Sequence, residues 1–173
     1  MKNTIIGILA LGALGVATFY LVNSYTYESK QGKSGGQGSY KDLTYMIDGK
    51  PVQLKNGYAE SESAPDSASK TITRYFGNEA EGDLDGDGVS DITFLLTQEG
   101  GGSGTFFYAA AALRKGDGYV SIDATLIGDR IAPQTTEYRG FSGIPGGYII
   151  VNYADRLPGE PMTTRPSMGK SLW

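Results

Sequence analysis

The segment from Asp83 to Asp91 constrains the fold of this chain more than any other feature. It reads DLDGDGVSD and runs directly into the β-branched and aromatic sequence ITFLLT, with carboxylates at loop positions 1, 3, 5 and 9 and glycine at position 6. Calcium takes about six to eight oxygen ligands, and a glycine at position 6 permits the sharp turn that directs them to one point. The segment therefore predicts a metal-binding turn that leads into a strand of a β-sheet.

The loop departs from the helix–loop–helix calcium motif. That motif needs a bidentate glutamate at position 12, where this chain has Phe94. A loop that ends at a position-9 aspartate and continues as a strand resembles the calcium loops of FG-GAP and integrin-type β-propeller blades, and the likeness extends to the metal ligands but not to the propeller. The ion that the spacing predicts is Ca2+, with ligands from the carboxylates of Asp83, Asp85, Asp87 and Asp91 and the backbone carbonyl of Val89.

A hairpin turn without a metal is the alternative, because Asp and Gly are favoured in turns. The charge density argues for the metal. Six carboxylates fall between Glu79 and Asp91, and no Lys or Arg lies in that stretch. Like charges crowded so closely are unfavourable unless a cation neutralises them. The sequence therefore favours an occupied calcium loop.

The residue types that are missing restrict the chemistry of the chain. It has 173 residues but no Cys and no His, which excludes disulfides, thiolate or imidazole metal ligands, thiol nucleophiles and the Ser-His-Asp triad. The net charge is −4 and no basic cluster is present, so no nucleic-acid partner is expected. The 26 glycines and 12 tyrosines favour a β-rich domain with many turns.

The N-terminal segment predicts a membrane anchor over residues 1–23. The run from Thr4 to Val22 is uncharged and mostly apolar, and a helix of this length spans a hydrocarbon core of about 30 Å. A cleaved signal peptide is the alternative, because Lys2 precedes the apolar run. The retained anchor is favoured, since the run is long for a signal peptide and no Ala-x-Ala site follows it.

Residues 24–40 are rich in Gly, Ser, Gln and Lys and predict a flexible linker. We expect a single-pass protein of the cell membrane with its C-terminal domain outside the cytoplasm, either periplasmic or extracellular. Lys2 ahead of the apolar run is how exported chains begin, and an acidic calcium loop suits the high calcium of external compartments. The expected partners are the membrane, through the N-terminal helix, and an unidentified protein or envelope polymer.

Residues 41–173 predict one exported domain of mainly β structure. Apolar runs alternate with turn sequences such as Asp48-Gly49 and Asn56-Gly57. Strands joined by short turns indicate antiparallel pairing in a meander or a sandwich, and no repeat of about 20–50 residues supports a propeller. The polar stretch Glu60–Ser69 predicts a surface loop. Strands are expected over Leu43–Ile47, Pro51–Leu54, Thr71–Phe76, Asp91–Thr97, Thr105–Leu113 (with a short helix as the alternative), Tyr119–Ile127 and Tyr148–Tyr153.

Four blocks of the sequence are similar to an uncharacterised bacterial envelope domain. They begin at Ser67 (SASKTITRYFG), Phe94 (FLLTQEGGGSGT), Leu126 (LIGDRIAPQTT) and Val151 (VNYADRLPGEPM). The domain that they resemble is met as a short membrane-anchored protein and also upstream of META-type domains. The likeness runs over most of residues 45–173. It implies an exported domain and brings no catalytic residue with it.

Two smaller features predict structural roles. Asp129-Arg130 and Asp155-Arg156 each place an acid beside a base after a strand-like run, and salt bridges at strand ends are the expectation. The stretch Pro158–Pro166 contains prolines that exclude a central strand. It is expected to be an irregular segment that packs across the domain.

Three classes of function fit these features. The favoured class is a membrane-tethered, extracytoplasmic β-rich module with a structural calcium site and a role in binding or envelope architecture. The second is a hydrolase that uses carboxylates alone, with Glu79, Glu99, Glu137 and Glu160 as candidates although their spacing marks no pair. The third is an accessory or inhibitor subunit of a membrane or secreted complex. An enzyme is less favoured, since the usual nucleophile–base sets are missing and no catalytic residue is predicted.

Overall fold

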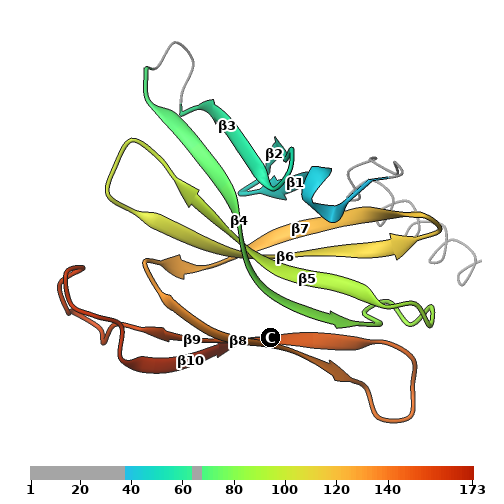
Figure 1. Cartoon of the computed structure of the whole chain (residues 1–173). Coiled ribbons are helices and arrows are strands. Elements are labelled where there is room, and N and C mark those ends of the chain that lie inside the picture. The colour runs from blue at the N-terminus through green and yellow to red at the C-terminus, as the bar shows by residue number, and fades with distance from the viewer. Residues whose placement is uncertain (1–37, 64–67) are drawn as a thin grey trace, which may run out of the picture. The chain divides into compact units, whose positions relative to one another are not determined.

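Ten strands and one turn of 3-10 helix make up the computed structural model, which describes residues 38–63 and 68–173 (Figure 1). The predicted anchor (1–23) and most of the predicted linker (24–40) lie outside these residues. No helix within the described ranges is long and apolar enough to cross a membrane. The prediction of a mainly β domain is confirmed. The elements are η1 (Tyr40–Asp42), β1 (Thr44–Ile47), β2 (Lys50–Gln53), β3 (Tyr58–Glu62), β4 (Lys70–Gly82), β5 (Asp91–Glu99), β6 (Thr105–Lys115), β7 (Gly118–Asp129), β8 (Ala132–Gly140), β9 (Gly147–Asp155) and β10 (Met168–Leu172).

The strands form two sheets, one in the order β2-β1-β7-β6-β5-β4-β3 and one in the order β10-β9-β8. From β3 to β7 consecutive strands are antiparallel neighbours, as the short turns predict. The expectation of purely antiparallel pairing is wrong for one pair, because β1 runs parallel to β7 with Ile47 opposite Ala124. Parallel neighbours cannot be joined by a hairpin, and the chain meets this requirement by passing through five other strands between β1 and β7.

The seven-stranded sheet curls until its two ends approach each other. β2 and β3 stand at opposite ends of the strand order, yet only a short turn separates them in the chain. Asn56 and Gly57 both have positive φ, 51° and 74°, which is the geometry that a tight two-residue hairpin turn needs. The flanking Lys55 and Tyr58 exchange backbone hydrogen bonds of 2.8 and 3.1 Å. The turn therefore ties the two ends of the sheet together.

The hollow of the curled sheet holds the main apolar core. Tyr45 and Phe94 are fully buried, and their rings meet edge to face with centroids 5.5 Å apart. The Tyr45 hydroxyl donates to the carbonyl of Tyr40 at 2.7 Å, so this buried phenol is paired. The buried members of this core are Leu43, Tyr45, Ile47, Leu54, Ile92, Phe94, Leu96, Tyr108, Ala110 and Ala112.

The three-stranded sheet forms a second layer against the outer face of the curl (Figure 1). Phe107 of β6 packs with Ile131 and Tyr153 between the two layers. β5 lies between the main core and this second sheet, and every residue from Asp91 to Leu96 is buried. Burial of both faces explains why the β5 sequence reads as a nearly continuous apolar run rather than as an alternation.

Most predicted strands are present, and several are longer than expected. β4 extends to Gly82 and β6 extends to Lys115, so the helix alternative for the β6 region is wrong. The polar stretch Glu60–Ser69 is not wholly a loop, because β3 continues to Glu62. β3, β8 and β10 are absent from the strands that the sequence predicts.

The acid–base pairs after β7 and β9 have structural roles. Asp129 and Arg130 form the expected ion pair at 2.9 Å. Asp155 instead pairs with Lys170 of β10 at 2.7 Å. Arg156 donates from Nε to the carbonyl of Thr164 at 2.7 Å, which holds the irregular stretch 158–166 against the domain. As its prolines predict, that stretch contains no strand.

Candidate metal centre

The acidic loop occupies the connection between β4 and β5. Gly86 and Gly88 have φ of 81° and 82°, a left-handed conformation that glycine adopts without steric cost. A Cβ on Gly86 would also meet Pro145 of the β8–β9 connection at 2.9 Å. Two glycines therefore let the loop turn sharply and lie close against the neighbouring hairpin.

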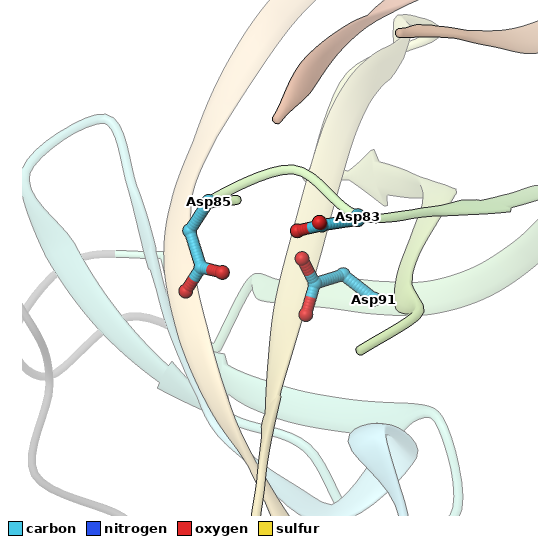
Figure 2. A group of neighbouring side chains, drawn as sticks. All are labelled: Asp83, Asp85 and Asp91. Atoms are coloured by element: carbon cyan, nitrogen blue, oxygen red, sulfur yellow. The ribbon is translucent and has the colours of Figure 1, made fainter. Parts of the chain in front are cut away.

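Three of the predicted ligands converge. One carboxylate oxygen each of Asp83, Asp85 and Asp91 lies within 4.8 Å of the others. Figure 2 shows the carboxylates of Asp83 and Asp91 side by side, with Asp85 facing them from the other end of the turn. Ca2+ binds oxygens at about 2.3–2.6 Å, so oxygens with this spacing can share one ion. The three residues could hold a metal.

Backbone amides fix two of these carboxylates. Asp91 is 1% exposed and accepts 2.8 Å hydrogen bonds from the amides of Leu84 and Arg114, one on each oxygen. Asp83 accepts from the amides of Gly86 at 2.7 Å and Gly88 at 2.9 Å. A carboxylate has about four lone-pair sites, so two amide bonds leave acceptor capacity for an ion. The amides hold both side chains in place before any ion binds.

Asp87 and Val89 are the other two predicted ligands, and the group of three side chains does not include Asp87. Asp87 accepts from the Val89 amide at 2.9 Å and from Lys115 Nζ at 2.6 Å. The hydrogen bond from Lys115 is the main reason that the pKa of Asp87 lies below its usual value, and the Val89 amide adds to the effect. Val89 lies in the same loop with its side chain 41% exposed. The sequence spacing thus predicts the three members of the convergent group, and the ligand roles of Asp87 and of the Val89 carbonyl stay predictions.

Lys115 is the residue that most changes the sequence-based argument. Its Nζ lies 2.5 Å from Asp85 Oδ2 and 2.6 Å from Asp87 Oδ2, and both carboxylates raise the pKa of the Lys115 ammonium. The charge argument for a metal ion is therefore weaker for Asp85 and Asp87, because an ammonium already neutralises part of their charge. An ion that took both oxygens of Asp85 would have to displace Lys115. No local signal identifies this lysine, because it lies 30 residues beyond Asp85.

Two tyrosine hydroxyls bind the carboxylate of Glu79, which keeps its negative charge. Tyr40 donates to Glu79 Oε1 at 2.5 Å, and Tyr75 donates to the same oxygen. These hydrogen bonds lower the pKa of Glu79. Burial first, and then the bond to Glu79, raises the pKa of Tyr75 to about 12. The carboxylate is thus stabilised in place, outside the candidate metal group.

Tyr138 of β8 supports the loop from the second sheet. Its hydroxyl donates to the backbone carbonyl of Asp83 at 2.8 Å. Its ring lies against Gly82, where a Cβ would meet the ring at 2.1 Å. The sequence gives no hint of this contact, since it joins elements 55 residues apart. The three-stranded sheet therefore helps to set the position of the first ligand.

The glutamates considered for a carboxylate hydrolase each have separate partners. Glu99 pairs with Arg74 at 3.0 Å, and Glu137 pairs with Arg139 at 2.5 Å. Glu160 accepts from the amide of Leu157 at 2.7 Å. With Glu79 bound by tyrosines, all four candidates have structural contacts of their own. This arrangement gives no reason to select two of them as an acid and a base.

Comparison of this chain with protein-family models, with curated proteins and with solved structures finds no match. The fold and the candidate site therefore define only a structural class. The chain is a mainly β protein with a curled mixed sheet, a covering three-stranded sheet and an aspartate group that could hold a metal.

Proposed function

We propose that this chain is a membrane-tethered, extracytoplasmic β-rich module whose 83–91 loop binds a structural Ca2+. The observation that carries the proposal is the convergence of Asp83, Asp85 and Asp91 to within 4.8 Å across the β4–β5 connection. An ion there would join the end of β4 to the start of β5. Because it would bind the folded chain only, it would stabilise the fold by mass action.

The donor set favours a hard cation. The chain has no Cys or His, so only oxygen ligands are available to the site, and Ca2+ and Mg2+ are the ions that prefer them. Ca2+ is the better candidate of the two, because it tolerates irregular geometry and Mg2+ requires a near-ideal octahedron. Competition from Lys115 points to a weak site, of the kind that fills at the millimolar calcium found outside cells.

The remaining parts of the proposal come from the sequence. Thr4–Val22 would anchor the chain in the cell membrane, residues 24–40 would act as a tether, and residues 41–173 would lie in the periplasm or outside the cell. The two layers would form a β-sandwich scaffold for binding or envelope architecture. The likeness to an anchored envelope domain supports this location. The partner would be a protein or an envelope polymer.

Thermal unfolding of the purified full-length chain with calcium and with excess chelator tests the metal site. At a calcium concentration of about 100 times the Kd, the folded state gains about 2.7 kcal/mol. For a domain of this size we expect the Tm to rise by roughly 10 °C. Asp85→Asn removes one carboxylate of the convergent group. The hydrogen bonds from backbone amides to Asp83 and Asp91 should remain. The substitution should reduce the calcium-dependent rise in Tm by more than half.

The matched control is Asp117→Asn, which makes the same change at an exposed aspartate in the nearby β6–β7 turn. It should respond to calcium as the unchanged chain does. Equal Tm values with calcium and with chelator in the unchanged chain would overturn the metal assignment. A magnesium arm of the experiment, at the same concentration, should give a smaller rise.

A further inference from the structure

The two layers leave an apolar groove between them, and its lining includes Leu84 of the acidic loop. The groove has a volume of about 250 Å³. Its floor includes Thr93, Ala109 and Ala111 of the large sheet, and Ile149 and Val151 of β9 lie on the other side. It is lined mainly by apolar surface, which is typical of sites that bind small molecules.

Small side chains explain why the layers do not close here. Thr93 stands opposite Ala111 in the register of β5 and β6, and Ala111 stands opposite Ile122 in the register of β6 and β7. The two methyl side chains of Ala109 and Ala111 fill little of the space between the layers. Further along β6, Phe107 fills the corresponding space with its ring. The small side chains of β6 thus leave the groove open.

The charge of the lining selects the kind of polar group that a ligand would carry. Asp123 is the only charged residue among the lining residues. It is exposed, and its carboxylate forms no ion pair or hydrogen bond with the described residues. A cationic group is therefore favoured at this edge of the groove, and an anionic group is disfavoured.

We propose that this groove binds a small amine with an apolar body, about the size of one substituted aromatic ring. A cavity of about 150 Å³ holds benzene, so the larger groove has room for a ring and a short side chain. The ring would lie over Ala109 and Ala111. The ammonium would face the carboxylate of Asp123 at the edge of the groove.

Trp173 provides a direct readout, because it is the only tryptophan of the chain, lines the groove and is 84% exposed. The experiment titrates the purified full-length chain with phenethylamine and follows Trp173 emission, with calorimetry as a second measurement. We expect saturable binding with one site and a blue shift of the emission. 2-Phenylethanol should bind about two- to fivefold more weakly, since an exposed ion pair contributes little, and 3-phenylpropionate should bind more weakly still.

Two substitutions separate the contributions. Ala111→Leu fills the groove and should weaken phenethylamine binding at least tenfold. Asp123→Asn should make the amine and the alcohol bind equally, whereas the control Asp117→Asn should change neither. If Ala111→Leu does not fold, Thr125→Leu closes the exposed rim of the same groove and should also weaken binding.

Two results would overturn the proposal. The first is the absence of saturable phenethylamine binding to the unchanged chain, or binding that a folded Ala111→Leu or Thr125→Leu variant retains. The second is equal affinity of the unchanged chain for phenethylamine and 2-phenylethanol, which would exclude recognition of the amine by Asp123.

Discussion

Lys115, the last residue of β6, contacts the acidic loop from the β6–β7 hairpin. Its ammonium neutralises part of the charge that Asp85 and Asp87 bring together. In the chain without a metal, this contact lowers the repulsion among the loop carboxylates. When an ion binds, the same contact becomes a competitor, because the ion and the ammonium need oxygens of the same side chain. The lysine therefore stabilises the metal-free loop and weakens the site.

Replacing this lysine should separate the two effects. We expect Lys115→Met to lower the Kd for Ca2+ severalfold, measured by calorimetry, and to lower the Tm in the presence of chelator. The control Lys55→Met removes an exposed lysine whose backbone alone has a described contact, and it should leave both quantities unchanged. Weaker calcium binding by Lys115→Met would contradict the competition, because it would mean that the ammonium supports the occupied site.

At the scale of single residues, the sequence predicts what lies within the loop and little else. The spacing of Asp83, Asp85 and Asp91 around tight glycine turns follows from local backbone geometry, and these three do converge. Lys115 and Tyr138 reach the loop from other hairpins. Their contacts depend on how strands pair and how the layers stack. No short-range pattern carries that information.

The contact between β4 and β8 joins the two sheets at the edge of the acidic loop. Gly82, the last residue of β4, lies under the ring of Tyr138, with no space for a Cβ. The hydroxyl of the same ring donates to the carbonyl of Asp83. One glycine thus allows the close approach that lets a tyrosine position the first ligand of the candidate site.

Gly82→Ala should therefore be destabilising although alanine is ordinarily tolerated in strands. The added methyl group would have to displace the ring of Tyr138, and overpacking of this kind costs about 1–3 kcal/mol of the free energy of unfolding, measurable by urea unfolding. Gly169→Ala, in β10, is the matched control, since nothing lies within 4 Å of its Cβ position. It should change the free energy by less than about 0.5 kcal/mol. Equal effects of the two substitutions would show that the ring yields without cost.

The strands that the sequence predicts are those with an apolar run or a hairpin turn of their own. β1, β2 and β9 are found close to their expected bounds. β3, β8 and β10 escape prediction because their sequences, YAESE, APQTTEYRG and MGKSL, are largely polar. β8 and β10 are strands because each pairs with the apolar β9 along its length, and β3 pairs with β4 along its length. Their conformation comes from a neighbour, so it cannot be found from their own residues.

In the whole domain, the two layers depend on each other for burial. The three-stranded sheet has few buried side chains of its own, and most of these face the outer surface of the curled sheet. In turn, β5 and β6 would expose Leu95 and Phe107 if that layer were removed, since both are buried and lie on the same face. Neither sheet is expected to keep its structure when the other unfolds.

Phe107→Ala tests this dependence. The ring is 7% exposed between the layers, where it packs with Ile131 and Tyr153, and its loss should cost about 3–5 kcal/mol of the free energy of unfolding. If the domain unfolds in one step, Trp173 fluorescence beside β10 and far-UV circular dichroism of the whole domain should give the same denaturation midpoint. The substitution should then shift both midpoints equally. The neighbouring Phe106→Ala, at a residue that is 39% exposed, should shift them much less. Two separate midpoints, with the fluorescence change occurring first, would instead mean that the three-stranded sheet unfolds on its own and that the curled sheet is stable without its cover.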